Sequence, residues 1–349
     1  MIPVRRDNWS RFGAIVVLAA TVLTACGGPG TSASSSASSA SSGASAGTDT
    51  SKRFTVVSGS FDLAELPYLG ALDDLRAKGY SIDYVQVPST DISVDGVSKG
   101  QFQFAADAVN VWMSAIQKGV PAKMILQRRY NDWQMWVAND IKSCEDLDGR
   151  TLAIHSEVSL TTAMVRQYVK ENCPQAKPNY VIIEGSDNRL AAMIADQVDA
   201  TALELVDVLH LKEEAGDRYH LLTSFADSLP KLSSNVEVVN ADFAAKNPTA
   251  VNDLVEAVIA AHRKVAEDPH YLLQLAEKYP SMVTSQPSDE ALQGYATLFP
   301  LDGGLTDDIV SYSIDFFTNT GLLKPGLKPT DVADLSYIDH ALKDLGPAK

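Results

Sequence analysis

The sequence predicts an α/β protein of two lobes, each with a mainly parallel sheet that carries helices on both faces. In the first part of the chain, short runs rich in β-branched and aromatic residues alternate with helical patterns. This alternation is typical of parallel sheets, because a helix usually returns the chain between neighbouring parallel strands. A second set of the same kind follows. The part of the chain with globular composition, about 300 residues, is long enough for two domains.

The first set gives three strands with two helices between them. Strands are expected at residues 54–57, 82–87 and 102–106, and the helices between them end near Lys78 and Lys99. The first helix places four leucines along one side: Leu66, Leu69, Leu72 and Leu75. This spacing predicts a helix with a buried face, and Gly79 follows it where a C-terminal cap belongs.

The rest of the chain predicts further strands and then a helical region. Strands are expected at residues 124–127, 151–154, 180–183, 200–205 and 235–239. Apolar residues at helical spacing then predict helices at 250–265, 269–278, 289–298 and 307–319. Two α/β lobes followed by helices are therefore expected.

Residues 1–25 have the features of a lipoprotein signal peptide. Three arginines, Arg5, Arg6 and Arg11, precede an apolar run at 14–23, which is too short to span a membrane. The run ends in LTACG, which resembles the bacterial lipobox and predicts cleavage before Cys26 and lipidation of that cysteine. The alternative is a free cysteine beside an apolar segment. Sec and twin-arginine export both stay open.

Residues 26–52 are expected to form a lipidated cysteine and a disordered tether, because they consist almost only of Ser, Ala, Gly and Thr. The formal charge of the whole chain is −15. Loss of residues 1–25, which carry three arginines and one aspartate, makes it −17. So acidic a protein is a poor candidate for binding nucleic acid.

Cys144 and Cys173 form an even pair in a chain expected to be exported, which favours a disulfide. Cys144 lies shortly before the strand at 151–154, and Cys173 ends the helix that returns antiparallel to it. Both cysteines should therefore reach the same edge of the sheet. Two separate reduced thiols are the alternative.

Four segments in order resemble the solute-binding proteins for taurine, sulfonates, nitrate and pyrimidine precursors of thiamine. Residues 98–107, SKGQFQFAAD, resemble ALASGELDFAxxG of that family, and 136–153 resemble LVVxxDIKSxxDLKGKxVAV. Residues 191–200, AAMIADQVDA, are similar to AAxxxGxVDA, and 238–248, VVNADFAAKNP, to VVNxxFxxKNP. The resemblance covers nearly all of the chain after the tether.

The resemblance implies the type II fold of periplasmic binding proteins: two doubly wound sheets joined by two crossovers, with the ligand cleft between the lobes. Lobe one would comprise residues 53–138 and 234–349, and lobe two residues 139–233. The chain would leave lobe one near Ala138 and return near Ser233. Because open α/β sheets bind ligands beyond the carboxyl ends of their strands, the strand-to-helix loops are the candidate site.

In lobe one, two such loops offer small, hydroxyl and aromatic groups. The loop after the first strand carries Ser60 and Phe61, a small residue and a ring that stacks on a ligand or packs in the core. After the second strand, Ser89 and Thr90 precede a helix, so they contact ligand or only cap that helix.

Acidic and basic candidates follow the later strands. Asp107 follows the strand at 102–106, where the family more usually has a small or hydroxyl residue, and it lines the cleft or caps the next helix. Glu204 ends the strand at 200–205. These acids favour a cationic, zwitterionic or hydrogen-bond-donating ligand. Arg128 and Arg129 follow the strand at 124–127 and are expected to pair with such carboxylates or with a ligand acid.

Lobe two offers a helix start and a histidine. Ser159 heads a helix whose first turn contains Thr161 and Thr162, and helix N-termini favour anionic or acceptor groups. Capping alone is the other interpretation. His155 ends a neighbouring strand and binds ligand or is structural. The histidines show no zinc spacing, so no metal and no cofactor are expected.

The expected function is that of an extracytoplasmic substrate-binding lipoprotein of an ABC importer, without catalysis. It would be a monomer, anchored to the outer face of the cell membrane by lipid on Cys26, such as palmitate. It would capture a small organic metabolite and hand it to a membrane permease. The alternatives are a ligand-sensing lipoprotein without import, or an enzyme on the same fold related to pyrimidine synthase, which uses a cysteine-rich iron motif that three cysteines cannot supply.

Overall fold

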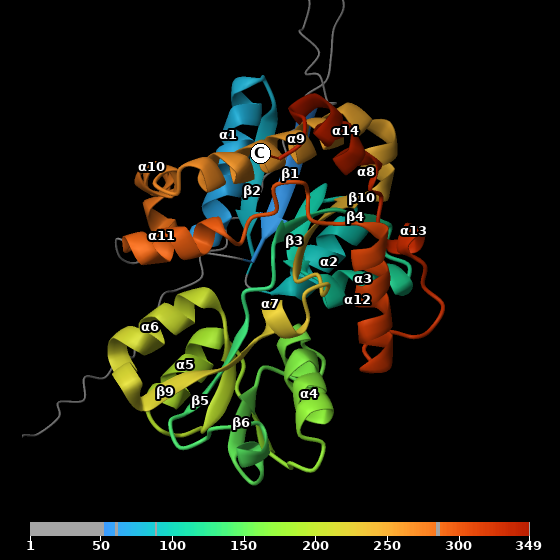
Figure 1. The fold of residues 1–349 in the computed structure, drawn as a ribbon. Helices are drawn as coiled ribbons and strands as arrows, with labels where there is room; N and C mark the ends of the chain where they lie inside the picture. Colours follow the sequence, from blue (N-terminus) through green and yellow to red (C-terminus); the bar gives the residue numbers. More distant parts are fainter. Residues whose placement is uncertain (1–51, 60–61, 88, 284–286, 349) are drawn as a thin grey trace, which may run out of the picture. The chain divides into compact units, whose positions relative to one another are not determined.

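The computed structural model describes residues 52–59, 62–87, 89–283 and 287–348. The signal peptide, Cys26 and the tether lie outside the described residues and stay predictions. Figure 1 shows two sheets, each with helices packed around it. No helix in the described ranges has both the length and the apolar character that a membrane crossing requires.

The first sheet has five strands in the order β2-β1-β3-β10-β4. Strand β1 pairs in parallel with β2 and β3, whereas β10 is antiparallel to both β3 and β4. The strands are β1 (Arg53–Ser58), β2 (Ser81–Gln86), β3 (Phe104–Ala108), β4 (Ala122–Arg129) and β10 (Asn235–Asn240). The return of β10 from late in the sequence completes this sheet.

The second sheet repeats this topology in the order β7-β6-β8-β5-β9. Strand β6 pairs in parallel with β7 and β8, and β5 is antiparallel to β8 and β9. The strands are β5 (Gln134–Ala138), β6 (Thr151–Ile154), β7 (Asn179–Ile182), β8 (Ala200–Leu203) and β9 (Tyr219–Ser224). The predicted α/β class with two sheets is therefore confirmed.

The first crossover lies earlier than expected. Strand β5 belongs to the second sheet, so assigning residues up to 138 to lobe one was wrong, and the chain changes lobe between Arg129 and Gln134. The apolar composition of a strand indicates that it is buried. It does not indicate which sheet contains the strand, because the partner strands are distant in sequence. The chain returns between Ser224 and Asn235, close to the predicted boundary.

Helices connect the strands and cover the sheets. They are α1 (Leu66–Ala77), α2 (Thr90–Ser98), α3 (Val109–Gln117), α4 (Leu160–Asn172), α5 (Ser186–Ile194), α6 (Leu205–Ala215) and α7 (Phe225–Ser228). After β10 follow α8 (Ala241–Lys246), α9 (Pro248–Glu267), α10 (Tyr271–Lys278), α11 (Asp289–Ala296), α12 (Asp307–Asn319), α13 (Pro329–Val332) and α14 (Ser336–Leu345). The long helix α9 packs against both α1 and α14.

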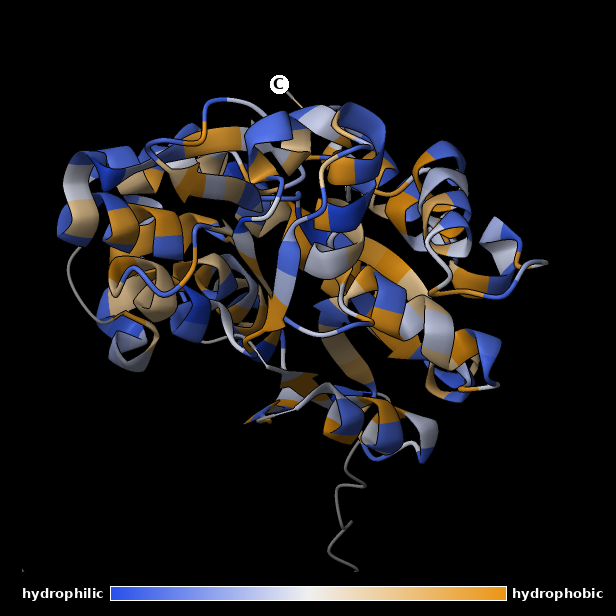
Figure 2. Cartoon of the chain, turned by 90° about the horizontal axis from the view of Figure 1, so that it is seen from below, coloured by the Kyte–Doolittle hydropathy of each residue, from blue (hydrophilic) through white to orange (hydrophobic). Residues whose placement is uncertain are grey.

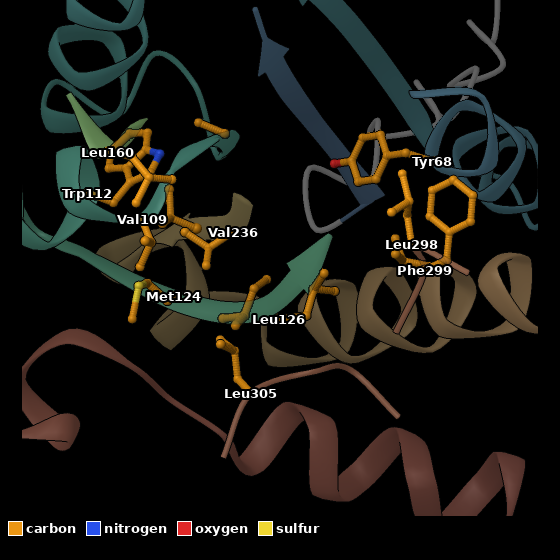
Figure 3. Close-up of a cluster of buried hydrophobic side chains, with 14 of the residues drawn as sticks. Tyr68, Val109, Trp112, Met124, Leu126, Leu160, Val236, Leu298, Phe299 and Leu305 are labelled. Atoms are coloured by element: carbon orange, nitrogen blue, oxygen red, sulfur yellow. The ribbon is translucent and has the colours of Figure 1, made fainter. Parts of the chain in front are cut away.

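The core forms along the predicted apolar faces. The four leucines of α1 named above are all buried, and many helices in Figure 2 carry both apolar and hydrophilic residues. Figure 3 shows part of the core, a single cluster of buried side chains that includes Leu160 of lobe two and Trp112 and Val109 of lobe one. Apolar packing therefore continues from one lobe into the other.

Cys144 and Cys173 form the expected disulfide, with Cα atoms 5.6 Å apart. Cys144 precedes β6, and Cys173 caps the C-terminus of α4. Both sulfur-bearing residues are buried. The disulfide therefore ties the end of α4 to the segment that leads into β6.

Candidate functional site

A cavity of about 410 Å³ lies between residues of the two lobes, where strands end and helices begin. Lobe one contributes Gly59, Val87, Ser89, Thr90, Ala106, Asp107, Ala108, Asn110, Val111, Arg129, Ser234 and Asn235. Trp133, in the first crossover, also lines it. Lobe two contributes His155, Ser159, Leu160, Thr161, Ser186, Arg189 and Glu204. The starts of α2, α3, α4 and α5 meet here because each follows a parallel strand of its sheet.

Asp107 lines the lobe-one wall. The sequence placed Asp107 after the strand expected at 102–106. In the structure it lies inside β3, because the strand extends two residues further than expected. Its Oδ2 accepts a hydrogen bond from Thr90 Oγ1 at 2.6 Å, and its Oδ1 accepts one from the Ala108 N–H at 2.7 Å. Burial raises the pKa of the Asp107 carboxyl, although both hydrogen bonds and the charge of Arg129 lower it.

The helix-capping interpretations do not hold on this wall. The N-cap of α3 is Ala108, with no side-chain capping bond, so Asp107 does not cap that helix. Ser89 is the N-cap of α2, but its hydroxyl makes no capping bond either. Ser89 and Thr90 both line the cavity, as expected.

The start of α4 forms part of the lobe-two wall. Ser159 is its N-cap: its Oγ accepts from the Thr162 N–H at 3.2 Å and donates to Thr162 Oγ1 at 2.9 Å. Ser159 and Thr161 line the cavity, whereas Thr162 does not and is buried behind them. Expecting both threonines in the cleft was wrong, because successive helical residues differ in direction by about 100°.

Glu204 lines the cavity at the end of β8 and is paired with a cation from the other sheet. Arg129 Nη2 lies 3.3 Å from Glu204 Oε2, and Arg129 Nη1 lies 3.6 Å from Asp62 Oδ2. Burial raises the pKa of Glu204 to about 8, against the lowering effect of Arg129. The carboxylates of Asp132 and Asp62 contribute to this rise in pKa. The Arg129 guanidinium is thus shared by several acidic side chains.

Arg128 is not in the cavity lining, so its placement in the cleft was wrong. Its Nη2 lies 2.7 Å from Glu65 Oε2, its Nη1 lies 3.6 Å from Glu237 Oε2, and its guanidinium carbon lies 3.6 Å from the centre of the Tyr68 ring. The register shift between Asn235 and Val236 makes Arg128 the extra residue of a β-bulge, and its side chain contacts Glu65, Glu237 and Tyr68. The neighbour, Arg129, lines the cavity instead.

Sequence reasoning missed Arg189, a buried cation in the lining. Its side chain donates to the backbone oxygens of Ala202 at 3.1 and 3.3 Å and of Gly185 at 3.0 Å. It is 1% exposed. Ser186 also lines the cavity. Ser186 and Arg189 are three residues apart on α5, so they share a helix face, and this spacing could have indicated Arg189 from the sequence.

His155 reaches the lining as expected. Its Nδ1 lies 3.1 Å from the Gly185 N–H, which can only donate, so Nδ1 is the acceptor and the ring proton is on Nε2 in the neutral form. Burial lowers the pKa of His155, and the charge of Arg189 lowers it further. The imidazole is therefore kept neutral at physiological pH.

Two aromatic residues near the first crossover differ in their placement. Trp133 lines the cavity, whereas Tyr130 is 40% exposed and lines a separate cavity of about 240 Å³. Glu184, an acid that follows β7, is exposed and absent from the lining. Ser60 and Phe61 lie outside the described residues, so their expected ligand contacts remain predictions.

Asn110 and Asn235 are polar lining residues that the sequence did not indicate. Asn110 Nδ2 donates to the backbone oxygen of Val158 in lobe two at 3.1 Å. Its buried Oδ1 has no partner within the described ranges. Over the same ranges, no cluster of three or more His, Cys, Asp or Glu residues is placed to hold a metal ion.

Solved structures share this fold at low sequence identity. The ligand-binding component of an ABC-type import system from Staphylococcus aureus, with zinc bound, is 13% identical, with a TM-score of 0.67 over 83% of this chain and 99% of that one. A putative periplasmic sulfonate-binding protein from Methylobacillus flagellatus is 15% identical, with a TM-score of 0.64 over 84% and 94%.

A Candida albicans protein described as having the generic periplasmic binding protein fold is 15% identical, with a TM-score of 0.59 over 83% and 94%. These likenesses confirm the predicted two-lobed fold. A comparison with curated proteins finds no significant match. The model of the family described as "NMT1/THI5 like" matches residues 75–271, more than half of the chain. The protein therefore belongs to the NMT1/THI5 like family.

Proposed function

We propose that the protein is the extracytoplasmic substrate-binding lipoprotein of an ABC importer, and that it captures a small organic metabolite between its lobes for delivery to the permease. The observation that carries this proposal is the cavity of about 410 Å³ lined from both lobes. A ligand that contacts both walls stabilises the closed arrangement, and a permease can recognise that arrangement.

The size and lining of the cavity suit a small organic solute. Ligand sites of about 300–1,000 Å³ hold metabolite-sized molecules, which a few precisely placed polar groups orient. Here hydroxyls from Ser89, Thr90, Ser159 and Thr161 and the ring of Trp133 surround the space. Two proteins that share this fold, an importer component and a putative sulfonate-binding protein, agree with solute capture.

The membrane anchor is proposed from the sequence. The LTACG motif and the tether would hold the binding domain near a permease while letting it move. By random-coil scaling, a tether of this length spans on the order of 25–30 Å. Labelling cells with an alkyne analogue of palmitate tests the anchor: the wild-type chain should be labelled and fractionate with membranes, and Cys26→Ala should lose both properties.

Ligand capture is tested with the full-length chain carrying Cys26→Ala. A broad metabolite screen by thermal shift, followed by calorimetry and small-angle X-ray scattering, should find a compound that raises the melting temperature and changes the scattering profile through lobe closure. Mass spectrometry of compounds retained through purification gives an independent search. Absence of any bound compound and of any closure would refute the function.

Import is distinguished from sensing by uptake in cells that lack this gene. Uptake of the identified compound should fall and should recover with the wild-type gene. Normal uptake in the deletion strain, despite tight binding in vitro, would point to sensing.

A further inference from the structure

The charged groups of the cavity are divided between its two walls. Lobe one presents the Asp107 carboxylate, and lobe two presents the Arg189 guanidinium. Arg129 and Glu204 also line the cavity, but Arg129 lies close to both Glu204 and Asp62. The charges without a close counterion are therefore one anion on one wall and one cation on the other.

Asp107 is held in place by neutral donors only. Its two oxygens accept from the Thr90 hydroxyl and the Ala108 N–H, and no cationic side chain lies within 4.0 Å among the described residues. Arg129 influences it from farther away, while its own close partners are Asp62 and Glu204. These bonds orient the carboxylate without neutralising its charge, and burying such a charge is unfavourable unless a cation meets it.

Arg189, a cation on the other wall, also lacks a close counterion. Its guanidinium donates to carbonyl oxygens of Ala202, Gly185 and Ile183 and lies 3.4 Å from His155 Nδ1, and these partners are all uncharged. No carboxylate lies within 4.0 Å of it in the described part of the chain. The nearest acids, Asp207 and Glu204 among them, act only at longer range. These partners orient the cation without neutralising its charge.

Arg263 shows that carbonyl contacts alone do not mark a site. It donates to the backbone oxygens of Leu301 at 2.8 Å, Leu345 at 3.2 Å and Gly346 at 2.9 Å, yet it lines none of the cavities described above. Arg189 differs because it combines near-complete burial with a place in the cavity wall.

We infer that the ligand is a zwitterion, with a protonated amine bound by Asp107 and a carboxylate or sulfonate bound by Arg189. This inference rests on the proposed solute-binding function. The neutral His155, whose Nε2 carries the proton, supplies a further donor on the lobe-two wall. Because the two recognising groups lie on different lobes, only a ligand with both charges satisfies both walls at once. A compound that lacks one charge leaves a buried group uncompensated.

The test uses matched probes on the full-length Cys26→Ala chain. The probes are the proteinogenic amino acids, β-alanine, γ-aminobutyrate and taurine, each compared by calorimetry with its deaminated acid and its corresponding amine. At least one zwitterion should bind, and removal of either charge should weaken binding by about tenfold to a hundredfold.

Two variants assign the charges to residues. Asp107→Asn should weaken binding of the zwitterion by about tenfold or more and leave binding of the deaminated acid unchanged. The control is Asp91→Asn, at an exposed site on the same helix as Thr90, which should change the binding of neither compound. Arg189→Gln should weaken the zwitterion and leave the corresponding amine unchanged. Arg263→Gln is its control for the loss of a carbonyl-bound guanidinium, and a thermal melt confirms that each variant is folded.

The outcomes separate the two proposals. If the protein closes on a ligand that is neutral or singly charged, the zwitterion inference is overturned while solute binding stands. The inference also fails if Asp107→Asn weakens the zwitterion and its deaminated acid equally. If no probe binds, no compound is retained through purification and no closure occurs, the solute-binding function itself fails.

Discussion

Arg129 Nη2 lies 3.3 Å from Glu204 Oε2, which ties the end of strand β4 in the first sheet to the end of strand β8 in the second. Both side chains are mostly buried, with 13% and 19% exposed. The same guanidinium lies 3.6 Å from Asp62. The junction of the lobes therefore contains more carboxylate than cation, and this excess makes the stability of the protein sensitive to pH.

Glu204 should make the protein less stable as pH rises from 5 to 8. Its pKa is raised from an ordinary 4.5 to about 8 by burial, so the folded protein holds a proton that the unfolded chain has lost. The stabilisation is complete below about pH 4.5 and disappears as pH approaches 8. Urea unfolding at pH 5, 6.5 and 8 should show a loss on the order of 2 kcal/mol, which Glu204→Gln reduces.

The control for this pH dependence is Glu184→Gln, which changes an exposed acid outside the cavity. It should leave the wild-type dependence intact. Part of the dependence should persist in Glu204→Gln, because burial also raises the pKa of Glu237 to about 8. An unchanged slope in Glu204→Gln would show that this carboxyl does not hold its proton in the folded state.

Arg128→Met should destabilise the protein strongly. It removes the cation that lies between Glu65 and Glu237 and leaves two buried acids without their partner. Breaking a buried ion pair from one side costs about 3–5 kcal/mol. Urea unfolding at pH 7 measures the loss, and adding Glu65→Gln to the variant should recover part of it.

The matched control is Arg53→Met. Arg53 lies 3.7 Å from Asp83 at the surface, with both side chains at least 60% exposed. Surface pairs contribute roughly 0–1 kcal/mol, so this variant should stay close to wild type. Equal losses in the two variants would mean that the buried position of Arg128 has no special importance.

Reduction of the disulfide should lower stability. The bond between Cys144 and Cys173 closes a loop with a sequence separation of 29 residues. In the chain-entropy model, such a loop contributes roughly 3–4 kcal/mol. Thermal melts with and without reductant should differ for the wild type and coincide for a variant with both cysteines changed to serine. Identical wild-type melts, with reduction verified by thiol counting, would contradict this prediction.

Gly304→Ala should destabilise the fold. Gly304 has a φ of +69°, and an added Cβ would lie 2.8 Å from Pro300 Cβ and 2.9 Å from Gln127 Cβ. Both the backbone conformation and the contact are unfavourable, so a loss of about 2 kcal/mol or more is expected in chemical unfolding.

Gly321→Ala separates these two causes. Gly321 has a similar φ of +78°, but an added Cβ would have no neighbour within 4 Å. Its loss should be about 1 kcal/mol, from backbone strain alone. If the two variants lose equally, crowding at Gly304 does not contribute.

The strand and helix pattern could be predicted from the sequence because it depends on neighbours in the chain. The leucine face of α1 is buried as its spacing indicated, and the strand expected at 151–154 has those bounds in the structure. The motifs in four segments also indicated the family, and they led attention to the ends of the strands. Six of the described candidates lie in the cavity wall: Ser89, Thr90, Asp107, Ser159, Thr161 and Glu204.

The remaining features depended on contacts between distant residues. Local sequence periodicity does not indicate which sheet contains β5 or which of Arg128 and Arg129 faces the cavity. It also does not indicate that Asp107 and Arg189 line the same cavity. By itself, the sequence determined the periodic burial of helices and strands and the chemistry available at their ends. The tertiary structure decided which of those groups meet, because strand pairing and lobe packing bring together residues far apart in the chain, and only that packing sets their burial and their counterions.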